Sequence, residues 1–191
     1  ETGFPAVLVA VDRYVTVQVR NAAQTGRITS DLNSGSWLEW HRRDSDMVIE
    51  PDEAPFSFVL AAMRIVEEVV VELGEPLQIF DLNITSELDD DSGRKFGLGS
   101  SAAVTVATVR ALTEHYGLDL SRMEQLKLAL LASIEVQRSG SGGDVAASMF
   151  GGWIAYTAFD REWAREQRAA GHSVVELLKT EWPGLSVRRV P

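Results

Sequence analysis

The sequence contains no cysteine, so it can form neither disulfide bonds nor a metal site held by thiolates. It has no apolar run near the roughly 18 residues that a membrane-spanning helix needs, and no secretory signal peptide is recognisable. Basic residues are scarce relative to acidic ones, and the formal net charge is −10 at pH 7. Such a charge disfavours general binding to nucleic acids or anionic membranes, although a local basic pocket could still hold a small anion. We therefore expect a cytoplasmic protein with no nucleic-acid or membrane partner.

The chain does contain enough apolar sequence for one well-packed domain. Its 191 residues are 45% hydrophobic, which is normal for a globular protein. Apolar residues at spacings of three and four predict helices at 55–73, 102–112, 121–138, 145–150, 161–170 and 173–179. Alternating or β-branched patterns predict strands at 27–32, 36–41, 77–85, 153–159 and 185–190, and at 6–20 either one long strand or two with a bend near Asp12. The irregular mixture of helices and strands predicts an α+β fold.

A glycine-bearing loop that leads into an apolar helix is the most informative stretch. Residues 92–112 read SGRKFGLGSSAAVTVATVRAL. Glycine lets the main chain approach a ligand closely, and Ser100 and Ser101 are favourable helix caps. The first helical turn leaves backbone N–H groups unpaired at its electropositive end, so the stretch predicts either a phosphate cradle or a capped core helix behind a turn. No lysine follows the last glycine, so the pattern is not that of the P-loop.

A second glycine cluster lies between two acidic residues. Glu135 is predicted to end one helix, and Asp144 follows the run Ser139 to Gly143 and opens the next helix. Mg²⁺ in proteins usually takes one or two carboxylates together with phosphates and water, and a carboxylate can also act as a general base. The pair therefore predicts a metal or catalytic site. The alternative is a helix-capping aspartate and a surface glutamate.

Several motifs, taken together and in this order, resemble the GHMP small-molecule kinases. They are Val11-Asp12-Arg13-Tyr14, Gly97-Leu98-Gly99-Ser100-Ser101-Ala102, Ser141-Gly142-Gly143-Asp144 and Gly151-Gly152-Trp153. Within that family they are most similar to the phosphomevalonate kinases of the bacterial mevalonate pathway. The resemblance implies a GHMP-kinase N-terminal domain over residues 1–191, with a mixed sheet packed against helices (ribosomal protein S5 domain 2-like). It also implies that the family's opening strand precedes Glu1 and that its C-terminal domain follows Pro191.

The resemblance implies ATP and Mg²⁺ as cofactors and a small phosphorylated acid as substrate. Asp144 would be the catalytic carboxylate, and Ser101 and Glu135 would bind Mg²⁺. Candidates for the acceptor are Arg13, Arg138 and Ser141. The ATP phosphates would be held by Lys95, Gly97, Leu98, Gly99, Ser100, Ser101 and Ala102.

The implied reaction is ATP-dependent phosphorylation of 5-phosphomevalonate to 5-diphosphomevalonate. Three alternatives stay open at this point. The chain could belong to another GHMP kinase, such as mevalonate kinase; to a GHMP-fold protein that binds a metabolite without catalysis; or to an unrelated α+β domain whose glycine loops are only turns. The sequence also leaves the oligomeric state open, a homodimer included.

Overall fold

The computed structural model describes residues 4–31, 35–50, 54–88 and 99–191. The strands are β1 (Ala6–Val9), β2 (Val15–Asn21), β3 (Thr25–Ser30), β4 (Trp37–Arg43), β5 (Asp46–Glu50), β6 (Phe80–Ser86), β7 (Trp153–Thr157) and β8 (Ser186–Arg189). The helices are α1 (Ser57–Glu72), preceded by the short 3-10 helix η1 (Ala54–Phe56), α2 (Ser100–His115), α3 (Arg122–Val136), α4 (Gly143–Phe150), α5 (Arg161–Ala169) and α6 (Val174–Lys179). The α+β prediction is confirmed.

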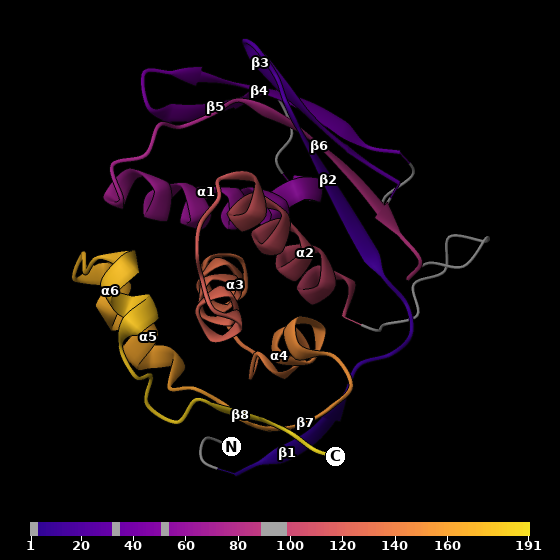
Figure 1. The fold of residues 1–191 in the computed structure, drawn as a ribbon, viewed down its shortest axis with the longest axis vertical. Coiled ribbons are helices and arrows are strands. Elements are labelled where there is room, and N and C mark those ends of the chain that lie inside the picture. Colours follow the sequence, from indigo (N-terminus) through magenta and orange to yellow (C-terminus); the bar gives the residue numbers. More distant parts are fainter. Residues whose placement is uncertain (1–3, 32–34, 51–53, 89–98) are drawn as a thin grey trace.

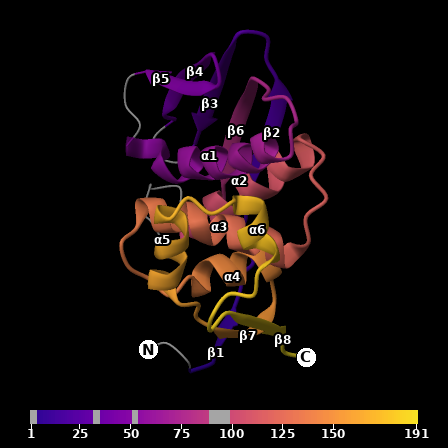
Figure 2. The ribbon, with the colours of Figure 1, turned by 90° about the vertical axis from the view of Figure 1, so that its left-hand side faces the viewer.

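The helices lie between two sheets, which Figures 1 and 2 show from two directions. The larger sheet has the order β2-β6-β3-β4-β5, and the smaller has the order β1-β7-β8. In the larger sheet β3 and β6 pair in parallel and the other neighbours are antiparallel, so this sheet is mixed. The helices α1 and α2 cover one face of the larger sheet, and α4 lies against the smaller one.

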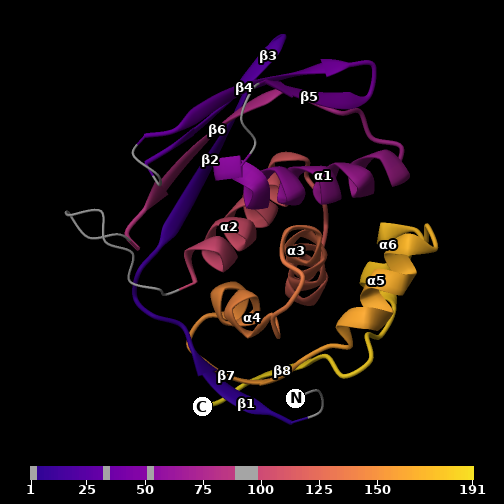
Figure 3. The ribbon, with the colours of Figure 1, turned by 180° about the vertical axis from the view of Figure 1, so that it is seen from behind.

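Of the two alternatives for residues 6–20, the structure has two strands separated near Asp12, and they belong to different sheets. β1 pairs with β7 in the smaller sheet, whereas β2 pairs with β6 in the larger one. The segment between them, residues 10–14, therefore crosses from one sheet to the other, as Figure 3 shows from behind. This crossing forms one wall of the cleft described below.

The sequence analysis missed strand β5. β4 and β5 form a tight hairpin in which Arg43 pairs with Asp46. Asp44 takes a positive φ of 57° in the turn, a conformation that asparagine, aspartate and glycine tolerate better than other residues. Because the turn is Asp-Ser rather than the more recognisable Asp-Gly, the residues there do not predict a hairpin.

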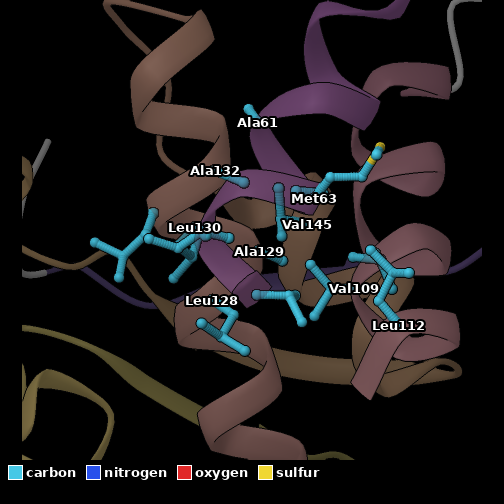
Figure 4. Close-up of a cluster of buried hydrophobic side chains, with 14 of the residues drawn as sticks. Ala61, Met63, Val109, Leu112, Leu128, Ala129, Leu130, Ala132 and Val145 are labelled. Carbon is cyan, nitrogen blue, oxygen red and sulfur yellow. The ribbon is translucent and has the colours of Figure 1, made fainter. Parts of the chain in front are cut away.

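The core forms where the apolar faces of α1, α2, α3 and α4 meet. α1 alone buries ten residues, and α2 and α3 contribute eight each. Ser121 and Glu124 form the predicted capping box at the start of α3, so that helix begins where its sequence indicates. Figure 4 shows part of this core, with Ala61, Met63, Val109, Leu112, Leu128, Ala129, Leu130, Ala132 and Val145 labelled. Among the described residues, no helix has both the length and the apolar content to cross a membrane.

An ion pair joins the larger sheet to α1 inside the protein. Arg42 of β4 forms a salt bridge with Glu67 of α1, and their side chains are only 9% and 8% exposed. The hydroxyl of Tyr116 donates to Glu67 Oε1 over 3.0 Å. Burial and the charge of Glu67 raise the pKa of Tyr116 to about 12, so this hydroxyl keeps its proton at neutral pH.

Candidate functional site

A cleft of about 880 Å³ opens where residues 10–14 cross in front of α2 and α4. Figure 1 shows these three parts of the chain meeting at one corner of the helical layer. Asp12 and Arg13 line the cleft from the crossing segment, and Ala107 from one face of α2. Asp144 lines it from the start of α4. The cleft therefore brings together the first, third and fourth motifs of the sequence, beside the helix that the second motif opens.

The start of α2 is arranged to receive an anion. The residue before the helix is Gly99, whose φ of 77° is left-handed. The backbone amides of Ser100, Ser101 and Ala102 have no acceptor among the described residues, since the first bond at this end runs from Ala103 N to Gly99 O. Unpaired amides and the helix dipole both favour a bound negative charge at this position.

The prediction that Ser100 or Ser101 caps this helix is wrong. Gly99 occupies the capping position, and no side chain makes a capping hydrogen bond. Both serines are the first residues inside α2 and are half-buried. Because neither hydroxyl closes the first turn, the amides stay available, as a ligand site requires.

Asp144 lies directly beside this helix terminus. A β-carbon built on Gly99 would be 3.5 Å from Asp144 Cβ and 3.8 Å from Asp144 Oδ2. Asp144 is the second residue of α4, and its Oδ1 accepts a hydrogen bond from Val145 N over 2.9 Å. The structure thus places a carboxylate next to free amides, although the two segments are 45 residues apart in the sequence. An anion held by the amides would be within reach of this carboxylate.

The other predicted phosphate contacts differ in position. Lys95, Gly97 and Leu98 lie outside the described residues. Ala102 is buried in the first turn of α2, so it can offer only its backbone amide.

Glu135 is not at the cleft. Its carboxylate lies 3.5 Å from Arg168 of α5, and the same arginine makes two 2.8 Å hydrogen bonds to Glu68 of α1. Burial raises the pKa of Glu135, as does the charge of Glu68, against the opposing effect of Arg168. Glu135 does not line the cleft, so the structure gives no support to its prediction as a magnesium ligand and assigns it to an ion-pair network. Its closeness to Asp144 in sequence did not indicate the side of α3 on which it lies.

The oxygens near the start of α2 fit a magnesium ion whose remaining ligands are phosphate oxygens and water. Within the described part of the chain, no three acidic or histidine side chains gather as a metal site. Mg²⁺ characteristically keeps several waters and is held by one or two protein oxygens plus phosphate oxygens. The carboxylate of Asp144 and the hydroxyl of Ser101 are suitable oxygens near the start of α2.

Of the three predicted acceptor contacts, only Arg13 lines the cleft. Its Nη1 donates to Asp12 O over 2.7 Å. Arg138 is exposed in the turn after α3 and does not reach the cleft lining. Ser141 lies in the same turn, where its Oγ accepts from Gly143 N over 3.3 Å, so its hydroxyl supports the turn rather than the cleft.

Sequence reasoning missed two further cations at the cleft, Arg110 of α2 and Arg122 of α3. The guanidinium of Arg110 makes no hydrogen bond or ion pair with the described residues, and that of Arg122 lies 6.0 Å from the ring centre of Phe150. Arg110 did carry a signal, since it is the only charged residue between Ser100 and Leu112. A lone charge in an otherwise apolar helix marks the face that is not packed in the core.

Replacing Gly99 with alanine tests whether the left-handed residue shapes the cradle. The substituted β-carbon meets Asp144 only at normal van der Waals distance, so the main cost is the positive φ, about 1–2 kcal/mol of folding stability. We expect nucleotide affinity to fall more than this loss suggests, because relaxing φ changes the direction of the amides of Ser100 and Ser101 relative to Asp144. Titration with a fluorescent ATP analogue checks this. Gly117→Ala, also at positive φ but with nothing within 4 Å, is the control.

Comparison with known proteins gives a consistent result. The family model described as the GHMP kinases N terminal domain matches residues 57–152. Phosphomevalonate kinase from Streptomyces sp. (strain CL190) is 44% identical over 203 aligned residues, which cover 100% of this chain and 53% of that protein. The chain therefore spans about half the length of that curated relative.

Solved structures agree with the sequence match. The Lin0012 protein from Listeria innocua has a TM-score of 0.89 at 34% identity, with 100% of this chain and 52% of that chain covered. Streptococcus pneumoniae phosphomevalonate kinase, in complex with phosphomevalonate and AMPPNP, has a TM-score of 0.83 at 25% identity, with 100% and 53% covered. The second of these structures shows that its own protein binds both a phosphorylated acid and a nucleotide analogue.

Proposed function

The chain belongs to the GHMP kinase family, and we propose that it is the nucleotide-binding N-terminal part of a phosphomevalonate kinase. In this reaction the terminal phosphoryl group of ATP moves to the phosphate of 5-phosphomevalonate, which yields ADP and 5-diphosphomevalonate. The observation that carries the proposal is Asp144 beside the free amides at the start of α2. The acceptor is inferred from the 44% identity to the Streptomyces phosphomevalonate kinase.

The amides at the start of α2 would hold the phosphate chain of ATP. Gly99 has no side chain to keep the phosphates away, and Ser100, Ser101 and Ala102 each offer an N–H group. Donors fixed in the direction of the transferring group stabilise the charge that develops on it, and they need no reorganisation during the reaction. Catalysis of phosphoryl transfer depends mainly on such positioning and charge stabilisation.

A magnesium ion bound here would neutralise part of the phosphate charge. ATP carries about four negative charges, whereas a helix terminus supplies the equivalent of about half a positive charge. The hydroxyl of Ser101 and the carboxylate of Asp144 would hold the ion.

Asp144 would orient the acceptor's phosphate and take a proton from it where one is present. The cationic side chains of the cleft would offset the repulsion between this carboxylate and an anionic acceptor. 5-Phosphomevalonate has a phosphate at one end and a carboxylate at the other, and guanidinium groups bind either in a two-pronged geometry. Arg13 and Arg110 line different walls of the cleft, so they could engage the two ends separately.

The test is an ADP-release assay on the full-length protein that contains this chain, with phosphomevalonate, mevalonate, homoserine and galactose as acceptors. We expect Mg²⁺-dependent turnover with phosphomevalonate alone. Turnover with mevalonate alone would reassign the protein to the mevalonate kinases. Absence of turnover with every acceptor, together with tight binding of one of them, would instead identify a metabolite-binding protein.

A further inference from the structure

The turn that delivers Asp144 to the cleft is held from outside by side chains of other elements. Residues 137–142 join α3 to α4; this turn contains two glycines, and a third, Gly143, begins α4. We propose that Tyr156 and Arg161 are positioning residues, which fix the turn and so hold the carboxylate of Asp144 against the start of α2. The inference rests on the proposed function, because it assigns a task within that reaction.

Tyr156 contacts the turn from the smaller sheet. It belongs to β7 in the smaller sheet, is only 3% exposed, and donates its hydroxyl proton to the carbonyl of Ser141 over 2.5 Å. Burial raises the pKa of Tyr156, and so does the charge of Asp144, so the hydroxyl stays protonated and remains a donor. The contact to Ser141 lies three residues before Asp144, close enough to set the direction in which α4 begins.

Arg161 holds the same turn from the side. It is the first residue of α5; its Nη1 donates to Gly140 O over 3.0 Å, and its Nη2 donates to Gln137 O. One planar guanidinium therefore spans the turn between two carbonyls. A lysine has a single nitrogen and could not reproduce this geometry.

The helix that carries Arg161, α5, is itself held in place by contacts with other parts of the chain. Arg168 of α5 is paired with Glu68 of α1, and the side chain of Asp160 caps α5 by accepting from Trp163 N over 3.0 Å. Arg165, from the middle of α5, donates to Arg138 O over 2.6 Å. Because α5 is anchored to the core, its arginines can hold the turn in one place.

The turn needs this support because its own backbone is permissive. Gly140 and Gly142 have φ values of 125° and 74°, and glycine loses more conformational freedom on folding than any other residue. Larger residues could stiffen the turn, but Gly142 has no room for one. A β-carbon there would lie 2.4 Å from Leu130 Cδ2. Hydrogen bonds from neighbouring elements are thus the means by which this segment is ordered.

The decisive experiment is a double-mutant cycle, measured by steady-state kinetics in the full-length enzyme. We expect Tyr156→Phe to lower kcat by about tenfold, the effect of one lost hydrogen bond on the alignment of Asp144, with KM for ATP nearly unchanged. Arg161→Met should lower kcat at least as much, and Arg161→Lys should restore part of the loss. In an Asp144→Asn background, Tyr156→Phe should have no further effect on kcat, because the group it positions is already gone.

Tyr116→Phe is the matched control. Tyr116 also donates from a partly buried hydroxyl, but to Glu67 beneath the larger sheet and away from the cleft. It should reduce stability and leave kcat unchanged. An equal loss of kcat from Tyr156→Phe with and without Asp144, or a loss in stability alone, would overturn the inference.

Hydrogen exchange separates this inference from the proposed function. The amides of Gly143 and Val145 flank Asp144 and are both hydrogen-bonded. Even if the protein phosphorylated none of the acceptors, Tyr156→Phe should speed exchange at these two amides, and Tyr116→Phe should not. Unchanged exchange at both amides would refute the positioning role independently of any activity.

Discussion

Asp144→Asn in the full-length protein is expected to lower kcat for the proposed kinase reaction by about 10³-fold, within the range that one positioned acid–base group contributes. Asparagine has nearly the same shape, and its carbonyl can still accept the hydrogen bond from Val145 N. What is lost is the negative charge beside the amides of α2, and with it the magnesium ligand and the proton acceptor proposed above. The measurement is steady-state ADP release under saturating ATP and acceptor.

The control for this prediction is Asp119→Asn, since Asp119 is exposed and does not line the cleft. It should leave kcat within a factor of about two, because surface substitutions of this kind rarely change stability by more than about 0.5 kcal/mol. Should Asp144→Asn retain more than a tenth of the wild-type kcat, Asp144 is not the catalytic carboxylate, and the cleft would have to work through other groups.

The largest loss of stability is expected for Glu67→Ala. Its carboxylate accepts from Arg42 and from Tyr116 inside the protein. Within the described part of the chain, the other hydrogen bonds of the Arg42 guanidinium go to the carbonyl of Gln78. Removing one partner of a buried pair leaves the other charge without compensation, so we expect the free energy of unfolding to fall by about 3–5 kcal/mol. Urea unfolding, followed by circular dichroism, measures this change.

The exposed pair of Arg27 and Glu39 provides the comparison. These side chains are 56% and 48% exposed, and Arg27 Nη2 lies 2.8 Å from Glu39 Oε1. Solvent screening limits their contribution, and Glu39→Ala should cost no more than about 1 kcal/mol. If both substitutions cost the same, burial of the Arg42–Glu67 pair does not have the energetic consequence assigned to it.

Much of the secondary structure could be predicted because it depends on neighbours in sequence. α1 follows an apolar repeat of three and four residues, and α3 begins at the capping box of Ser121 and Glu124. The glycine pairs at 142–143 and 151–152 marked both ends of α4. The order of the motifs also indicated the family, since each consists of residues close together in the chain.

The missed features depended on contacts between distant segments. β5 is short and its turn lacks glycine, so it is stabilised mainly by pairing with β4. The division of residues 6–20 between two sheets follows from the partners β7 and β6, which come much later in the chain. Arg110 reaches the cleft because residues 10–14 and α4 build its other walls.

By itself the sequence determined which residue types could hold a phosphate: the glycine before α2, the serines at its start and an acid after a second glycine turn. Only the tertiary structure decided which acid lies beside that glycine. Asp144 lies against Gly99, whereas Glu135 pairs with Arg168. The physical reason is that a side chain's direction at a helix end is set by the elements packed around it. Here those are α5, β7 and α1, and two of these follow the glycine turn in the sequence.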